Sequence, residues 1–187
     1  MTLRIERTSG RRRTRIRLSG EFRAGHIDQV KAELRSARQP VALDEGESIE
    51  ALGKQGAPPA GAAAVRPDDH GFLWIDKHAF GKAFADDVDP TEAAVMAAVQ
   101  KPLSVNSFAT KSGPPAWKHI PSWYMVATDD QMIPPPAEEF MAKRIGATVK
   151  KVAASHAAIV SHPKEVADLI TLAVESVGKS VNTRVSR

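Results

Sequence analysis

An aspartate and a histidine follow two consecutive strand-like runs near the end of the sequence, and together they could transfer protons. The first run, 122–128, leads to Asp130, and the second, 148–153, leads to His156. A carboxylate can orient an imidazole, and the imidazole can then take a proton from a nucleophile. The pair therefore predicts the acid and the base of a Ser–His–Asp relay, with Asp129 as an adjacent alternative for the acid.

The nucleophile of such a relay has no counterpart in the sequence pattern. A serine nucleophile often stands in a Gly-x-Ser-x-Gly turn, and the 187 residues contain no such turn. Ser155 directly precedes His156, but neighbouring side chains of an extended segment point to opposite sides. None of the serines in this part of the chain is therefore predicted to be the nucleophile; they are Ser48, Ser107, Ser155 and Ser161.

The first 44 residues predict a hairpin, a helix and a short strand. Alternating apolar and polar residues over 2–8 and 11–18 are typical of two half-buried strands, with a turn signal at 9–10. Apolar residues recur at helical spacing over about 25–38, and a short apolar run at 41–43 predicts a buried strand.

The middle of the chain, 45–112, predicts a cap-like excursion that is mostly helical. Asp89 before Pro90 is a typical helix start, because its carboxylate can accept from the free N–H groups of the first turn. The aromatic side chains of this part are expected to fill its underside; they are Phe72, Trp74, Phe80 and Phe84. The predicted helices cover 47–55, 78–85, 90–100 and 103–111, and 56–67 is predicted to be irregular.

The last part, 113–178, has the most regular pattern. Its strands at 122–128 and 148–153 alternate with helices at 135–145 and 163–177, which predicts a βαβα unit with parallel strands. Phe140, Met141 and Ile145 are expected to face inward, and 179–187 is predicted to be a basic tail. The predicted fold class is α/β, with one mixed sheet, helices on both of its faces and the cap-like excursion.

Composition narrows the possible functions. The chain has no cysteine, so disulfides and thiolate chemistry are excluded, and its histidines show no metal-ligand spacing. We expect no cofactor and no metal ion. No apolar run is long enough to span a bilayer, and the N-terminus lacks an apolar signal core, so we expect a cytoplasmic protein without membrane contact.

Charge is unevenly distributed along the chain. Residues 1–44 hold eleven Lys/Arg and five Asp/Glu, a net charge of +6, whereas the whole chain carries +4. The arginines over 11–17 are expected to form a solvated strand face that protects a sheet edge. No aromatic residue is interleaved among them, so nucleic-acid binding is not predicted.

Several short sequence motifs follow one another in the rest of the chain, among them 44–48, 84–87, 121–128, 154–156 and 161–163. From about 44 to 177 the sequence resembles the C-terminal part of bacterial α/β-hydrolases of a small, esterase-like family. In that family a helical cap follows the sixth strand, the seventh strand delivers the acid and the eighth the histidine. The resemblance implies that Asp130 is the acid, that His156 is the base and that a small-molecule ester is the substrate. The family's oxyanion loop and nucleophile elbow are missing.

The N-terminal segment carries a second, shorter resemblance. The phrases at 1–7, 13–20, 26–31 and 41–44 are similar to the opening of small bacterial STAS-like proteins. This implies a chimeric chain with its seam near 43–46. Two functions stay open: an esterase-type hydrolase that is inactive alone, or a non-catalytic interaction module that docks to a protein partner or to a second copy of itself.

Overall fold

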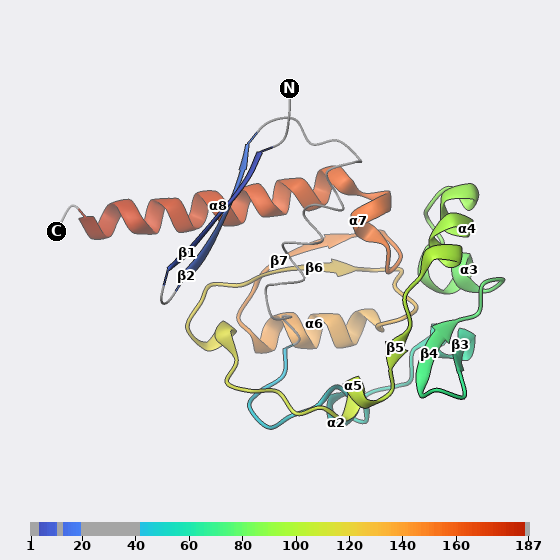
Figure 1. The fold of residues 1–187 in the computed structure, drawn as a ribbon. Helices are drawn as coiled ribbons and strands as arrows, with labels where there is room; N and C mark the ends of the chain where they lie inside the picture. The colour runs from blue at the N-terminus through green and yellow to red at the C-terminus, as the bar shows by residue number, and fades with distance from the viewer. Residues whose placement is uncertain (1–3, 11–12, 20–41, 186–187) are drawn as a thin grey trace. The chain divides into compact units, whose positions relative to one another are not determined.

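The computed structural model describes residues 4–10, 13–19 and 42–185, with side chains described over 42–176 (Figure 1). The chain divides into two compact units, 1–40 and 41–187.

The first unit contains an antiparallel hairpin of β1 (Arg4–Gly10) and β2 (Arg13–Ser19). The two predicted strands are confirmed, but the turn is not where the sequence predicted it. Ser9 and Gly10 both pair with residues of β2, so the strand continues through the expected turn. The predicted helix over 25–38 lies outside the described residues.

The second unit contains the predicted βαβα arrangement. Strands β6 (Trp123–Ala127) and β7 (Thr148–Val152) pair in parallel, as expected for a strand–helix–strand crossover. Helix α6 (Pro135–Arg144) lies on one side of the strands and α8 (Pro163–Val185) on the other (Figure 1). Because helices cover both faces of these strands, Val126 of β6 is completely buried. A strand covered in this way needs an apolar run, as the sequence has here.

Two details of this unit differ from the sequence prediction. Phe140 was expected to face inward but is 49% exposed, whereas Met141 is buried as expected. Glu138, Met141 and Ala142 form the buried stripe of α6, at helical spacing. Helix α8 continues to Val185 instead of ending at 177. No proline follows Pro163, and a single glycine costs only about 1 kcal/mol in a helix, which does not end it.

The middle region is more mixed than predicted. The expected helices appear as α2 (Ile49–Gly53), α3 (Phe80–Phe84) and α4 (Pro90–Val99), and Asp89 caps α4 by accepting from two backbone N–H groups. Two segments that were predicted to be irregular (56–67) and helical (103–111) contribute strands to a small antiparallel sheet. Its strands are β3 (Val65–Pro67), β4 (Phe72–Ile75) and β5 (Leu103–Ser104), and the short helices nearby are the 3-10 helices η2 (Ala60–Ala64) and η3 (Ala116–Lys118) and α5 (Asn106–Ala109).

The α/β fold class is confirmed, whereas the single continuous sheet is not found among the described residues. Their strands form three small sheets: β1–β2, β3–β4–β5 and β6–β7. Ala42 and Leu43, from the predicted strand at 41–43, are buried but belong to no strand. The Leu43 carbonyl accepts from the Trp117 side chain at 3.1 Å, so a side chain satisfies it in place of a neighbouring strand.

The cap-like region packs against the loop that follows β7. A cluster of buried apolar side chains joins α3 and α4 to Ala157, with the Phe84 ring and Val160 of α7 (Ala158–Ser161) packed against it. At the other end, Glu47 pairs with Arg144 of α6 at 2.8 Å. The apolar cluster and the ion pair therefore hold the middle region against the βαβα unit at two separate places. No helix in the described part of the chain is long and apolar enough to cross a membrane.

Candidate active site

Asp130 and His156 meet at the carboxyl ends of the two parallel strands. The distance between Asp130 Oδ2 and His156 Nδ1 is 2.7 Å. The backbone ladder continues beyond both strands, because the Asp129 N–H donates to the Ala154 carbonyl at 3.1 Å. Parallel strands end at the same sheet edge, and this added bond keeps the two following loops together. The two residues chosen from the sequence are therefore in direct contact.

The turn after β6 holds the Asp130 carboxylate in a single orientation. Its Oδ1 atom accepts from the backbone N–H of Met132 at 2.7 Å and of Ile133 at 2.9 Å. The side chain is only 2% exposed. Burial by itself would raise the pKa of Asp130, but the hydrogen bond and charge of His156 and the two backbone N–H groups outweigh it and lower the pKa. Asp130 is thus a carboxylate with Oδ2 directed at the imidazole.

The rival acid, Asp129, does not contact His156 through its side chain. It is exposed, while its neighbour Asp130 is buried. The two residues lie in a turn closed by the Asp130 N–H, which donates to the Ala127 carbonyl at 3.3 Å, and only the Asp130 side chain is hydrogen-bonded to the imidazole. The distances select Asp130 as the partner of His156.

Aromatic side chains from the cap-like region pack against the imidazole. The Phe84 ring meets the His156 ring edge-on, with 4.6 Å between centroids, and Phe80 stacks on Phe84 at 5.0 Å. Phe80 is buried, as predicted for an aromatic side chain that fills the underside of the cap-like region. Phe72 and Trp74 are 38% and 37% exposed, so the same prediction is wrong for these two side chains.

The His156 Nε2 atom has no hydrogen-bond partner among residues 42–176, and no serine hydroxyl there bonds to His156. Ser48 caps α2 by accepting from Ala51, and Ser155 donates to the Phe84 carbonyl. Ser161 lies 2.9 Å from the Nδ1 atom of a different histidine, His162. The hydroxyls of these three serines therefore bond to groups other than the His156 imidazole.

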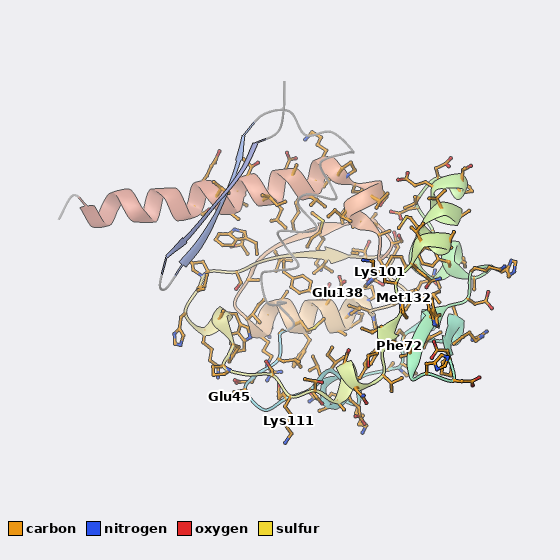
Figure 2. The ribbon with its side chains drawn as sticks, in the orientation of Figure 1. Glu45, Phe72, Lys101, Lys111, Met132 and Glu138 are labelled. Carbon is orange, nitrogen blue, oxygen red and sulfur yellow. The ribbon has the colours of Figure 1, made fainter. Side chains whose placement is uncertain are left out.

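Glu138 is a part of the site that the sequence analysis did not identify. It lies on α6 and reaches toward β6, where its Oε2 atom accepts from the Ala127 N–H at 2.7 Å (Figure 2). It is 6% exposed, and this burial, together with the nearby negative charge of Asp130, raises the pKa of its carboxyl to about 7. In the sequence it reads as an ordinary acidic residue near a helix start. The one sign in the sequence that Glu138 faces inward is its helical spacing from Met141 and Ala142.

Gly61 supports the Asp130 turn from the middle region. Its N–H donates to the Gln131 carbonyl at 2.7 Å. A Cβ atom at this position would lie 2.7 Å from Met132 Sδ and 2.8 Å from the Gln131 carbonyl oxygen. The methionine end could move, but the backbone oxygen could not without shifting the turn that orients Asp130.

We expect Gly61→Ala to destabilise the protein by about 1–3 kcal/mol, because the added methyl group overpacks a backbone contact. Urea denaturation measures this loss. Gly56→Ala is the control, since a Cβ atom there meets nothing within 4 Å. Equal stability of the two variants would show that the Gly61 contact does not constrain the turn.

The comparisons with known proteins identify the fold. Residues 21–169 match the Alpha/beta hydrolase family. No curated protein sequence is significantly similar to the chain. The STAS-like resemblance of the first 44 residues is not tested by any of these matches and stays a prediction.

Three solved structures illustrate the similarity. A pyrethroid hydrolase, PytH, solved with BIF, has a TM-score of 0.59 at 23% identity, covering 74% of this chain and 59% of that chain. A pyrethroid hydrolase from Sphingobium faniae JZ-2 has a TM-score of 0.56 at 24% identity, covering 70% and 56%. A mutant of polyneuridine aldehyde esterase has a TM-score of 0.53 at 12% identity, covering 69% and 57%.

The present chain thus spans less than two thirds of the length of these structures. The family match nevertheless covers most of the chain and includes both Asp130 and His156. The chain belongs to the alpha/beta hydrolase family.

Proposed function

We propose that this chain carries the proton-transfer half of an esterase-type active site, with His156 as the base and Asp130 as the residue that orients it. The observation that supports this most is the 2.7 Å contact between Asp130 Oδ2 and His156 Nδ1, in a turn where both oxygens of the carboxylate are engaged.

The geometry implies a direction for proton transfer. The Asp130 carboxylate can only accept, so His156 Nδ1 donates to it and the lone pair of the imidazole lies on Nε2. Nε2 would take the proton of a nucleophilic hydroxyl as that oxygen attacks an ester carbonyl, and would then protonate the leaving alcohol. Asp130 would stabilise the imidazolium that exists between these two steps.

The proposed substrates are small carboxylic esters with an apolar group next to the reacting carbon. The aromatic side chains beside His156 would favour apolar substituents through burial of their surface. The similar solved structures are a pyrethroid hydrolase and an aldehyde esterase by name, which supports the class.

The proposal also includes inactivity of the chain alone. A base acts only on a proton within about 3 Å, and among the described residues no hydroxyl bonds to His156. We therefore expect hydrolysis of p-nitrophenyl acetate by the wild type to equal that of His156→Ala. A fluorophosphonate probe should label no serine. Turnover that disappears in His156→Ala, or a labelled serine, would show that this chain contains its own nucleophile.

A further inference from the structure

Two carboxyl side chains are buried in the described part of the chain, and they lie next to each other. Asp130 and Glu138 are 5% and 6% exposed, respectively. The mechanism proposed above uses only Asp130. A second buried carboxyl beside it needs a physical account, since burying an ionised group without a partner is costly.

The hydrogen bonds determine which of the two carries a proton. Two carboxyl groups can hydrogen-bond only if one of them is protonated. Asp130 already accepts from His156 through Oδ2 and from two backbone N–H groups through Oδ1, all of which favour the ionised form. Glu138 accepts a single N–H, that of Ala127. The shared proton therefore belongs to Glu138.

We propose that Glu138 is a positioning residue of this site: its protonated carboxyl donates a hydrogen bond to Asp130 and holds that carboxylate against His156 Nδ1. The inference deepens the proposed function and rests on its assignment of His156 and Asp130. Glu138 would not touch the substrate. It would act by restricting the orientation of Asp130, in addition to the Met132 and Ile133 N–H groups.

The surroundings of Glu138 give it a pH dependence. Burial raises the pKa of Glu138 to about 7; the Ala127 N–H opposes this, while the charge and hydrogen bond of Asp130 add to it, and the charge of His156 lowers it. The remaining titratable neighbour is Tyr124 of β6, whose own pKa is raised by burial and then by Glu138 and Asp130. Above about pH 7, Glu138 would ionise and repel Asp130.

The sign of the effect on stability follows from this raised pKa. The folded protein holds the Glu138 proton more tightly than the unfolded chain does, for which the ordinary value is 4.5. The contribution of Glu138 to stability is therefore complete below that value and decreases as the pH rises to about 7, above which it levels off. Between those limits, loss of the proton favours unfolding.

The test compares wild type with Glu138→Gln, which keeps a donor for Asp130 and an acceptor for Ala127 but cannot ionise. From about pH 5 to about pH 8, the unfolding equilibrium constant should rise about one to two orders of magnitude more in the wild type than in Glu138→Gln. Glu139→Gln is the matched control, because Glu139 is exposed on the same helix, and it should follow the wild type. Parallel pH curves for the wild type and Glu138→Gln would overturn the proposal.

Two NMR measurements report on the site itself. The proton on His156 Nδ1 should give a downfield signal that weakens in the wild type as the pH passes about 7 and persists in Glu138→Gln. If that variant does not fold, 13C titration of the wild type replaces it: one glutamate carboxyl should titrate near pH 7, and should still do so in Glu139→Gln. Titration of every glutamate in its ordinary range would overturn the proposal.

The stability and NMR measurements need no ester substrate, so they test the role of Glu138 separately from the proposed function. Turnover is tested separately, after the N-terminal half of a related hydrolase, with its nucleophile elbow, has been added in trans. No turnover in that mixture, together with the Glu138-dependent pH effect, would refute the proposed function and leave the role of Glu138 intact. Turnover in that mixture together with parallel pH curves would retain the function and refute the role of Glu138.

Discussion

Asp130→Asn is expected to lower ester turnover by about ten-thousandfold in a reconstituted site, in which the N-terminal half of a related hydrolase, including its nucleophile elbow, is added in trans. The reason lies in the turn after β6. The N–H groups of Met132 and Ile133 would bind the asparagine oxygen, so its NH2 group would face His156 Nδ1. The imidazole would then hold its proton on Nε2, and the lone pair needed there would be lost.

Asp129→Asn is the matched control, because Asp129 is adjacent, exposed and makes no side-chain contact with His156. Its turnover should stay within about twofold of the wild type, in line with the small effects of surface substitutions. The rate of p-nitrophenyl acetate hydrolysis in the mixture measures both. Loss of turnover in Asp129→Asn with retention in Asp130→Asn would reverse the assignment of the acid.

Phe80→Ala is expected to destabilise the protein by about 3–5 kcal/mol, because it removes a buried aromatic ring and leaves a cavity. Phe80 is 3% exposed and belongs to the cluster that joins α3 and α4 to the loop after β7. Its ring also supports Phe84, which contacts His156. In urea denaturation the midpoint should fall while the slope stays the same.

Phe140→Ala provides the comparison for this prediction. It makes the same chemical change on α6, but Phe140 is 49% exposed, so the change in unfolding free energy should be within about 0.5 kcal/mol. Similar losses in the two variants would mean that the cap-like region does not pack on the histidine loop as described.

The local elements near the site could be predicted from sequence because their signals are local. The apolar run at β6, the Asp89 cap of α4 and the helical spacing in α6 each act within a few residues. The family resemblance added the order of strands, and with it the pairing of Asp130 with His156. Elements with weak local signals were missed, such as β5 with its two residues, which exists only because β4 pairs with it.

The side of α6 that faces the interior could not be decided from its residue types. Phe140 is the more apolar side chain, yet Glu138 is the one buried. The hydrogen bond from the Ala127 N–H offsets part of the cost of burying that carboxyl. Its donor belongs to β6, so no pattern within the helix contains it.

By itself, the sequence determined the chain's strand–helix–strand order, the absence of a Gly-x-Ser-x-Gly turn and the candidates for the acid and the histidine, with Asp129 still open as an alternative acid. Only the tertiary structure decided that Asp130 and not Asp129 meets His156, that Phe84 contacts the imidazole and that Glu138 is buried with its carboxyl at the Ala127 N–H. The physical reason is that periodicity and caps depend on neighbours along the chain. Carboxylate orientation, ring packing and pKa depend on atoms that folding brings within a few ångströms from distant segments.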